Sequence, residues 1–133
     1  MVTYSKYLSP VGWYVGSYLL RFIELNAMGN NDPDGRFLAW ENTVIVQASD
    51  FDEAYRKVQA IASQEATPYE GGPDAVPVQW VFEGITELLP IYEPLQDGSE
   101  IMWTEHESLK LSDLKKRARS LDQLRGNISA KEA

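Results

Sequence analysis

The stretch WYVGSYLLRFIEL, residues 13–25, decides the fold of this chain of 133 residues. Written as an extended strand, it is apolar on both faces. One face would carry Tyr14, Tyr18, Leu20 and Phe22, and the other Trp13, Val15, Leu19 and Ile23. Such a strand is typical of the centre of a sheet covered on two sides, or of a sheet that uses one face to contact another chain. Gly16 leaves a gap in it where another element can approach closely.

Three further runs resemble strands, and each holds one tryptophan. They are RFLAWENTVIVQA (36–48), VPVQWVFEGITEL (76–88) and GSEIMWTE (98–105). We expect strands over 36–47, 78–89 and 100–104. Between the second and third strands, an acidic helix start at Asp50 and Glu53 precedes apolar residues spaced three and four apart. These are Phe51, Ala54, Tyr55, Val58, Ile61 and Ala62.

The sequence therefore predicts an α+β fold. We expect a mainly antiparallel four-stranded sheet, in the order strand, strand, helix, strand, strand, followed by a C-terminal helix. That last helix would begin at Ser112 or Asp113 and end at Gly126. Its apolar stripe is the candidate surface for self-association: Leu111, Leu114, Ala118 and Leu121. The stripe is too short for an isolated coiled coil, so it should dock either on its own sheet or on a second copy.

Charge divides the chain unevenly. Residues 1–109 hold five basic and seventeen acidic side chains, a net of −12, whereas residues 110–133 hold seven basic and three acidic, a net of +4. We expect residues 1–109 to form one sheet domain and residues 110–133 to be its basic helical extension. An acidic body disfavours nucleic acid and anionic membrane and favours a basic protein partner, for example a neutralised toxin or nuclease, or the basic segment of a second copy.

Composition narrows the chemistry further. The chain has no cysteine, which excludes disulfides, thiolate nucleophiles and cysteine metal sites. Its N-terminus lacks the apolar stretch of a signal peptide, and no run approaches the roughly 20 apolar residues of a membrane span. These features lead us to expect a cytoplasmic protein.

Several short motifs, taken in their order along the chain, give it a pattern that resembles a widespread bacterial family catalogued as a domain of unknown function (4288-type). They are Trp13-Tyr14-Val15, Trp40-Glu41, Ala48-Ser49-Asp50 with Glu53-Ala54, Trp80-Val81-Phe82-Glu83-Gly84, and Leu95 with Asp97-Gly98-Ser99-Glu100. The resemblance covers about residues 13–104. It implies a compact unit of two strands, a helix and two strands, and it implies no activity.

The first long loop contains a pattern like that of a calcium-binding loop. Asn30, Asp32, Asp34, Gly35 and Glu41 fall at positions one, three, five, six and twelve of that pattern. Ca²⁺ prefers six to eight oxygen ligands and a glycine at the sharp turn. Against this reading, the flanking segments are predicted strands rather than helices. A turn rich in Asn, Asp, Gly and Pro can also match by chance. Calcium is the one cofactor that the sequence suggests.

Two groups of residues could in principle carry enzymatic chemistry. His106, the single histidine, lies in a polar segment with no nucleophile or orienting acid indicated. Carboxylates on the strands, including Glu41, Glu83 and Glu100, could instead converge beside the tryptophans and perform acid–base or metal-dependent chemistry. The simpler interpretation is a solvated row of glutamates that discourages edge pairing.

The favoured hypothesis is a small, non-enzymatic binding or protein-interaction module that self-associates, with a homodimer as the simplest form. Aromatic residues often anchor such contacts, and acidic neighbours would select a basic partner. The candidate residues are Trp40, Glu41, Trp80, Glu83, Glu100 and Trp103. The alternative is a small carboxylate- or metal-dependent enzyme, or a calcium-binding protein, that uses the 30–41 loop and the strand glutamates.

Overall fold

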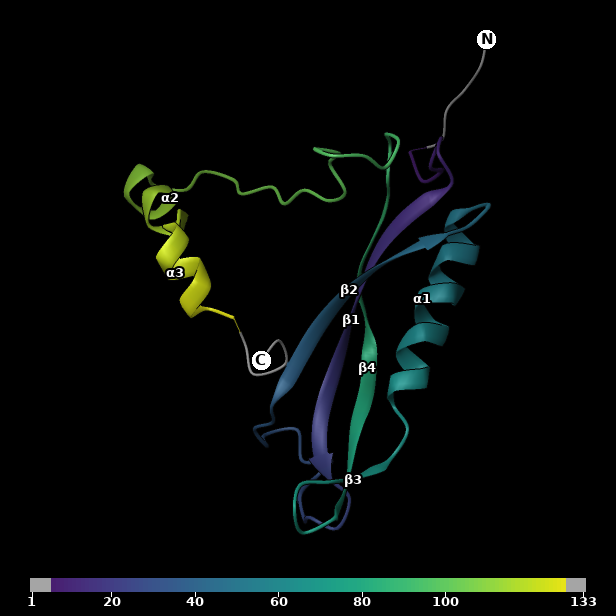
Figure 1. The fold of residues 1–133 in the computed structure, drawn as a ribbon, viewed down its shortest axis with the longest axis vertical. Helices are drawn as coiled ribbons and strands as arrows, with labels where there is room; N and C mark the ends of the chain where they lie inside the picture. Colours follow the sequence, from purple (N-terminus) through teal and green to yellow (C-terminus); the bar gives the residue numbers. More distant parts are fainter. Residues whose placement is uncertain (1–5, 129–133) are drawn as a thin grey trace. The chain divides into compact units, whose positions relative to one another are not determined.

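A computed structural model describes residues 6–128 of the chain. The chain divides into two compact units, Met1–Met102 and Trp103–Ala133. The first unit contains one helix and all strands of the described part of the chain (Figure 1). In order they are β1 (Trp13–Glu24), β2 (Ala39–Gln47), α1 (Phe51–Glu65), β3 (Tyr69–Gly71) and β4 (Val76–Pro90).

The strands form one antiparallel sheet in the order β2-β1-β4-β3. This architecture confirms the predicted α+β fold, with the helix between the second and third strands of the chain. β1 lies inside the sheet, as its two apolar faces predicted. Tyr14 on one face and Val15 on the other are both fully buried.

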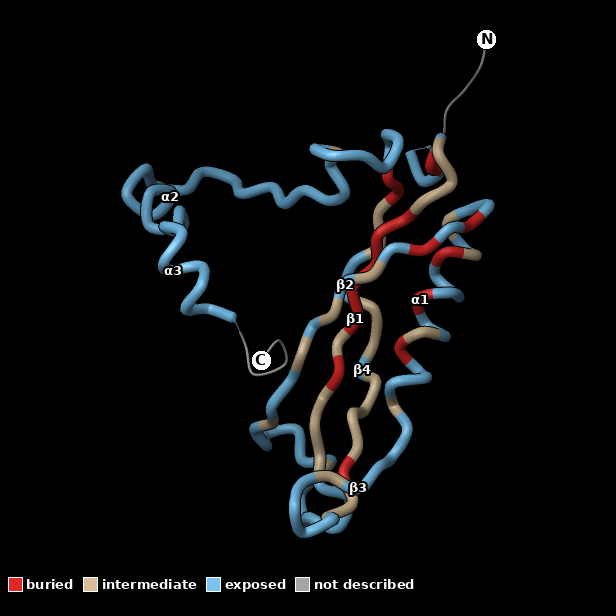
Figure 2. Tube along the Cα trace, in the orientation of Figure 1, coloured by how far each residue is buried: buried red, intermediate tan, exposed pale blue. Residues whose placement is uncertain are grey.

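Helix α1 packs on one face of the sheet, against β1, β4 and β2. Figure 2 shows buried positions along β1 and on the side of α1 that faces the sheet. The core includes Tyr14, Tyr18 and Leu20 of β1 together with Ala54 and Val58 of α1. Gly16 allows this close packing, because a Cβ atom placed there would come within 2.7 Å of a Val58 methyl carbon. The gap predicted at Gly16 is therefore filled by the helix.

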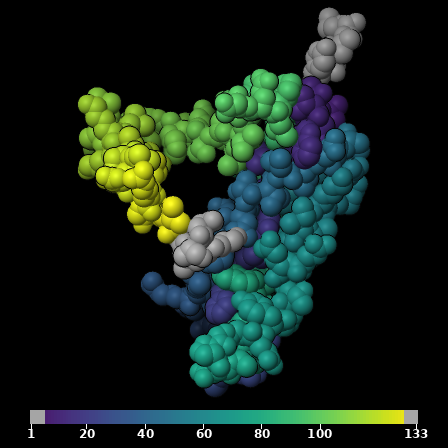
Figure 3. Space-filling view, viewed as in Figure 1, coloured from purple at the N-terminus to yellow at the C-terminus, as the bar shows by residue number. Residues whose placement is uncertain are grey.

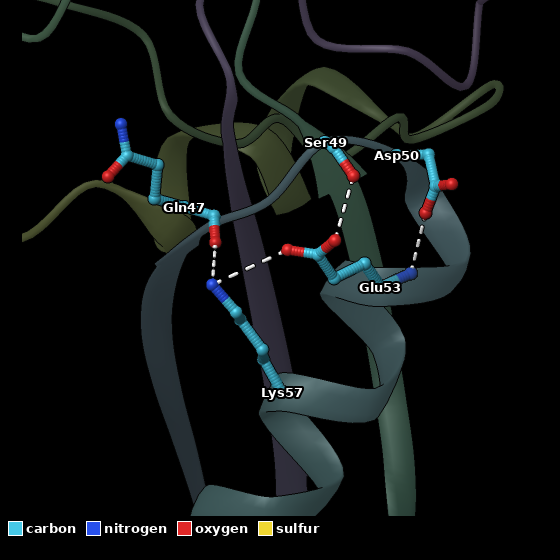
Figure 4. Close-up of polar contacts among 5 residues, drawn as sticks. All are labelled: Gln47, Ser49, Asp50, Glu53 and Lys57. Carbon is cyan, nitrogen blue, oxygen red and sulfur yellow. Dashed lines mark hydrogen bonds and ion pairs between the residues drawn. The ribbon is translucent and has the colours of Figure 1, made fainter.

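Local side chains fix the start of α1 (Figure 4). The Asp50 carboxylate accepts a hydrogen bond from the Glu53 backbone N–H at 2.7 Å, which satisfies one of the free donors at a helix N-terminus. Glu53 in turn accepts from the Ser49 hydroxyl at 2.7 Å. This hydrogen bond, with Lys57 beside it, lowers the pKa of Glu53. Lys57 also donates to the Gln47 carbonyl at 2.5 Å, so the helix start is tied to the end of β2.

The prediction of a strand over residues 100–104 is wrong. Those residues are exposed and irregular, and the Glu100 backbone N–H donates to the Glu93 carboxylate instead of to a neighbouring strand. The fourth strand of the sheet is β3, which lies between α1 and the predicted strand over 78–89 and pairs with the start of β4. A turn with positive φ at Gly72 and Ala75 reverses the chain between them. Periodicity could not reveal a three-residue strand of this kind.

The second unit contains α2 (Leu111–Arg117) and α3 (Leu121–Gly126) where one continuous helix was predicted. The prediction is wrong because Ala118 adopts an extended conformation, with φ −68° and ψ 137°. Ser120 then starts α3 through a capping box with Gln123. No helix in the described residues is long and apolar enough to cross a membrane.

Candidate functional site

Two irregularities in β4 shape the sheet face opposite α1. The pairing with β1 shifts between Ser17 and Tyr18 and again between Leu19 and Leu20, so that Thr86 and Glu83 are left without a partner in β1. Gly84, with φ +149°, adopts the conformation that the second shift requires. Extra residues of this kind re-aim side chains, and both Thr86 and Glu83 contact polar groups on this face.

Arg21 is the centre of a polar cluster at one end of this face. Its Nε lies 3.2 Å from the Glu83 carboxylate, and its Nη1 donates to the Asn30 carbonyl at 2.6 Å. The guanidinium carbon lies 4.6 Å from the centre of the Phe37 ring. The cluster lines an open pocket of about 300 Å³ between the sheet and the first long loop. Arg21 thereby holds the loop that spans residues 25–38 against the strands.

The candidate calcium ligands do not gather into one site. The Asn30 side chain donates to the Glu24 carbonyl at 2.8 Å, and Asp32 accepts from the Asp34 backbone N–H at 2.9 Å, which is ordinary turn chemistry. Glu41 lies on β2 and accepts from the Thr86 hydroxyl. Among the described residues, no group of three or more His, Asp or Glu side chains is placed to hold a metal ion.

The strand glutamates are also separated from one another. Glu83 is paired with Arg21 and Glu41 with Thr86, so each carboxylate already has a partner within the sheet. Glu100 lies outside the sheet, in the irregular, mostly exposed segment that follows the buried Ile91. The structure therefore joins Glu41 and Glu83 to one face of the sheet but does not bring Glu100 to it.

The tryptophans divide into two groups. Trp40 and Trp80 stack with ring centres 4.7 Å apart, and Trp80 also meets Phe22 edge-on at 5.1 Å. Both indoles are partly buried, and Trp80 packs on the core. Trp103 belongs to no strand, and the residue is 51% exposed to solvent. The expectation that every tryptophan lies in a strand is wrong for Trp103.

The candidate residues for self-association are solvent-exposed. Every described residue from Glu100 to Ile128 is classed as exposed, and neither α2 nor α3 buries a side chain. This segment is coloured green to yellow in the space-filling view (Figure 3). From Lys110 to Ile128, the exposed apolar side chains are Leu111, Leu114, Ala118, Leu121, Leu124 and Ile128. They form a surface without a core beneath it.

One buried hydroxyl has a specific acidic partner. The Tyr18 hydroxyl donates to the Glu65 carboxylate at 2.9 Å, which connects β1 to the end of α1. Burial is the main cause that raises the pKa of Tyr18, and the neighbouring Glu65 carboxylate raises it further. Asn42 donates to the same carboxylate at 3.3 Å. This contact stabilises the packing of the helix and offers no free nucleophile or base.

A known family matches residues 13–103, which span the whole sheet, α1 and the segment that follows β4. The chain belongs to the family described as Domain of unknown function (DUF4288). The resemblance expected from the sequence is thus confirmed. Helices α2 and α3 lie outside the matched DUF4288 region. Searches of curated proteins and of solved structures found no match to the chain.

Sequence reasoning missed two residues of the polar cluster in this DUF4288 domain. Arg21 is the only basic residue within the apolar run 13–23, and a charge in a central strand is a signal of a specific partner. Phe37 gave no such signal, since an aromatic residue before a strand is ordinary. The positions of Thr86 and Glu83 depend on the bulges, which are properties of strand pairing.

Proposed function

We propose that the protein is a non-enzymatic interaction module that self-associates, and that its basic C-terminal segment docks on the acidic body of a second copy. One observation carries the proposal: the segment from Lys110 to Ile128 has exposed leucines and no buried residue. Helices of seven and six residues are not stable alone in water. Exposed apolar side chains concentrated in one segment of this kind are typical of a contact surface.

Charge supports a second copy as the partner. The segment carries a net of +4 and residues 1–109 a net of −12, so each chain presents a surface that attracts the opposite surface of another chain. The attraction can act between separate chains as well as within one. We place the contact between separate chains. A basic partner protein would compete for the same acidic body.

The test measures association of the full chain by analytical ultracentrifugation over a range of protein and salt concentrations. We expect a dimer that weakens as salt rises, because salt screens the attraction between exposed opposite charges. A chain of residues 1–109 should dissociate at least about tenfold more readily, since burying a single leucine contributes roughly 1.5–3 kcal/mol.

A matched pair of variants distinguishes specific docking of the C-terminal segment from non-specific hydrophobic association. Leu114→Ser combined with Leu121→Ser keeps every charge and should weaken the dimer as the truncation does. Leu95→Ser removes an exposed leucine of similar exposure, 40% against 45% for Leu114, from the first unit and should leave it intact. A full chain that stays monomeric at every concentration, or a dimer unaffected by removing the segment, would overturn the proposal.

A further inference from the structure

The outer edge of β2 has unused backbone hydrogen-bonding groups. β2 is the end strand of the sheet, so only one of its edges pairs, with β1. The Phe22 N–H donates to the Leu38 carbonyl and the Ala48 N–H to the Gly12 carbonyl, each at 2.9 Å. Hydrogen-bonded positions alternate along an antiparallel pair, so the even-numbered residues of β2 bond to β1 and the odd-numbered ones face outward.

Almost all of these outward groups lack a protein partner. In the described part of the chain, no group bonds to the backbone N–H or C=O of Glu41, Thr43 or Ile45. The exception at this edge is the Gln47 carbonyl, which accepts from Lys57. Lys57 therefore marks where the open edge ends.

β2 also lacks the features that usually prevent edge pairing. Its sequence AWENTVIVQ contains no proline, lysine or glycine, and its pairing with β1 runs without a bulge. Its one charged residue is Glu41, and Ile45, four positions further, is 43% exposed. A nine-residue, nearly neutral edge in an otherwise acidic body is suited to a strand of the same kind.

We propose that β2 pairs antiparallel with β2 of a second copy about a two-fold axis at Thr43, which joins the two sheets into one. This inference rests on the proposed self-association and names its symmetric contact. Opposite residues of an antiparallel pair share a face, so both α1 helices would cover the same face of eight strands, four from each copy.

Strand length and charge together favour this register. Centred on Thr43, the nine residues of β2 lie opposite the nine of the other copy, and each Glu41 lies opposite Ile45. The two Glu41 residues are then four positions apart, roughly 14 Å along the strand. A shift centred on Asn42 would bring them to a diagonal separation of about 7–8 Å, and one centred on Glu41 would place them directly opposite. Both alternatives oppose like charges.

The test uses single cysteines, because the natural chain has none. In the full chain under mild oxidation, Thr43→Cys should form a disulfide-linked dimer in high yield. Directly opposite strand residues have Cα atoms about 5.5 Å apart, within the range that a disulfide spans. The matched control, Ile45→Cys, sits on the same strand and face but roughly 14 Å from its copy, and should remain reduced. Circular dichroism checks that both variants are folded.

A charge exchange at Ile45 tests the register without a thiol. Ile45→Glu would face Glu41 of the other copy twice in each dimer and should raise the dissociation constant about two- to thirtyfold. Ile45→Lys adds a charge of similar size but faces Glu41 favourably, and should leave the dimer as tight as the natural chain or tighter.

The outcomes separate the two proposals. A dimer in which Thr43→Cys does not cross-link, or in which Ile45→Cys cross-links equally well, overturns the edge pairing while self-association stands. A monomeric chain overturns both. A cross-linked dimer that is indifferent to the loss of residues 110–133 supports the edge and overturns the role of the C-terminal segment.

Discussion

At the scale of single residues, Gly16 decides how closely α1 can approach the sheet. We expect Gly16→Ala to lower the free energy of unfolding by about 1–3 kcal/mol, because its Cβ would meet Val58 at 2.7 Å and Leu88 at 3.4 Å. Chemical denaturation measures this. Adding Val58→Ala should recover part of the loss, so that the double variant costs less than the two single changes together. Strictly additive losses would contradict the close contact.

Tyr18 gives the protein a defined alkaline sensitivity. Its pKa is raised in the folded state by burial and by Glu65, so the folded chain holds this proton above the ordinary pKa of about 10. The stability from the neutral phenol is full below pH 10 and is lost as pH rises through the folded pKa.

The variant Tyr18→Phe tests this assignment. It should lower stability by roughly 1–3 kcal/mol at neutral pH, because the hydrogen bond to the Glu65 carboxylate is lost. Above pH 10 its stability should fall less steeply than that of the natural chain, in denaturation curves measured from pH 8 to 11. Equal slopes for the two proteins would show that another group controls the alkaline transition.

At the scale of elements, long and periodic segments were predictable and pairing details were not. The alternation in residues 13–25 predicted β1, and the spacing after Asp50 predicted α1 together with its cap. β3 escaped prediction because three residues carry no period, and residues 100–104 resembled a strand without a neighbour to pair with. Local apolar pattern measures the tendency to be buried, whereas pairing depends on where the chain turns.

The candidate site shows the same limit. Glu41 and Glu83 were identified from the sequence, but their partners Thr86 and Arg21 follow from two shifts in the pairing of β4 with β1. The break at Ala118 likewise depends on backbone dihedrals that an apolar stripe does not report. The stripe was predicted to dock on its own sheet or on a second copy, and its leucines are exposed in the structure.

At the scale of the whole molecule, the chain consists of two compact units, of which the first holds the sheet and α1. The core residues all lie between Tyr14 and Ile91, and the compact first unit ends at Met102. We therefore expect a chain of residues 1–109 to keep a cooperative unfolding transition. Below the concentration at which the full chain dimerises, the free energy of unfolding of residues 1–109 should lie within about 0.5 kcal/mol of the full chain's, as for ordinary surface changes.

Protein concentration then distinguishes docking between chains from docking within one chain. When the full chain dimerises, mass action stabilises it, so its midpoint of thermal unfolding should rise with concentration while that of residues 1–109 rises less. If the segment instead docked on its own body, the truncated chain would be less stable at every concentration by the same amount. Calorimetry of both chains over a hundredfold range of concentration makes the comparison, and a constant difference would assign the segment to its own sheet.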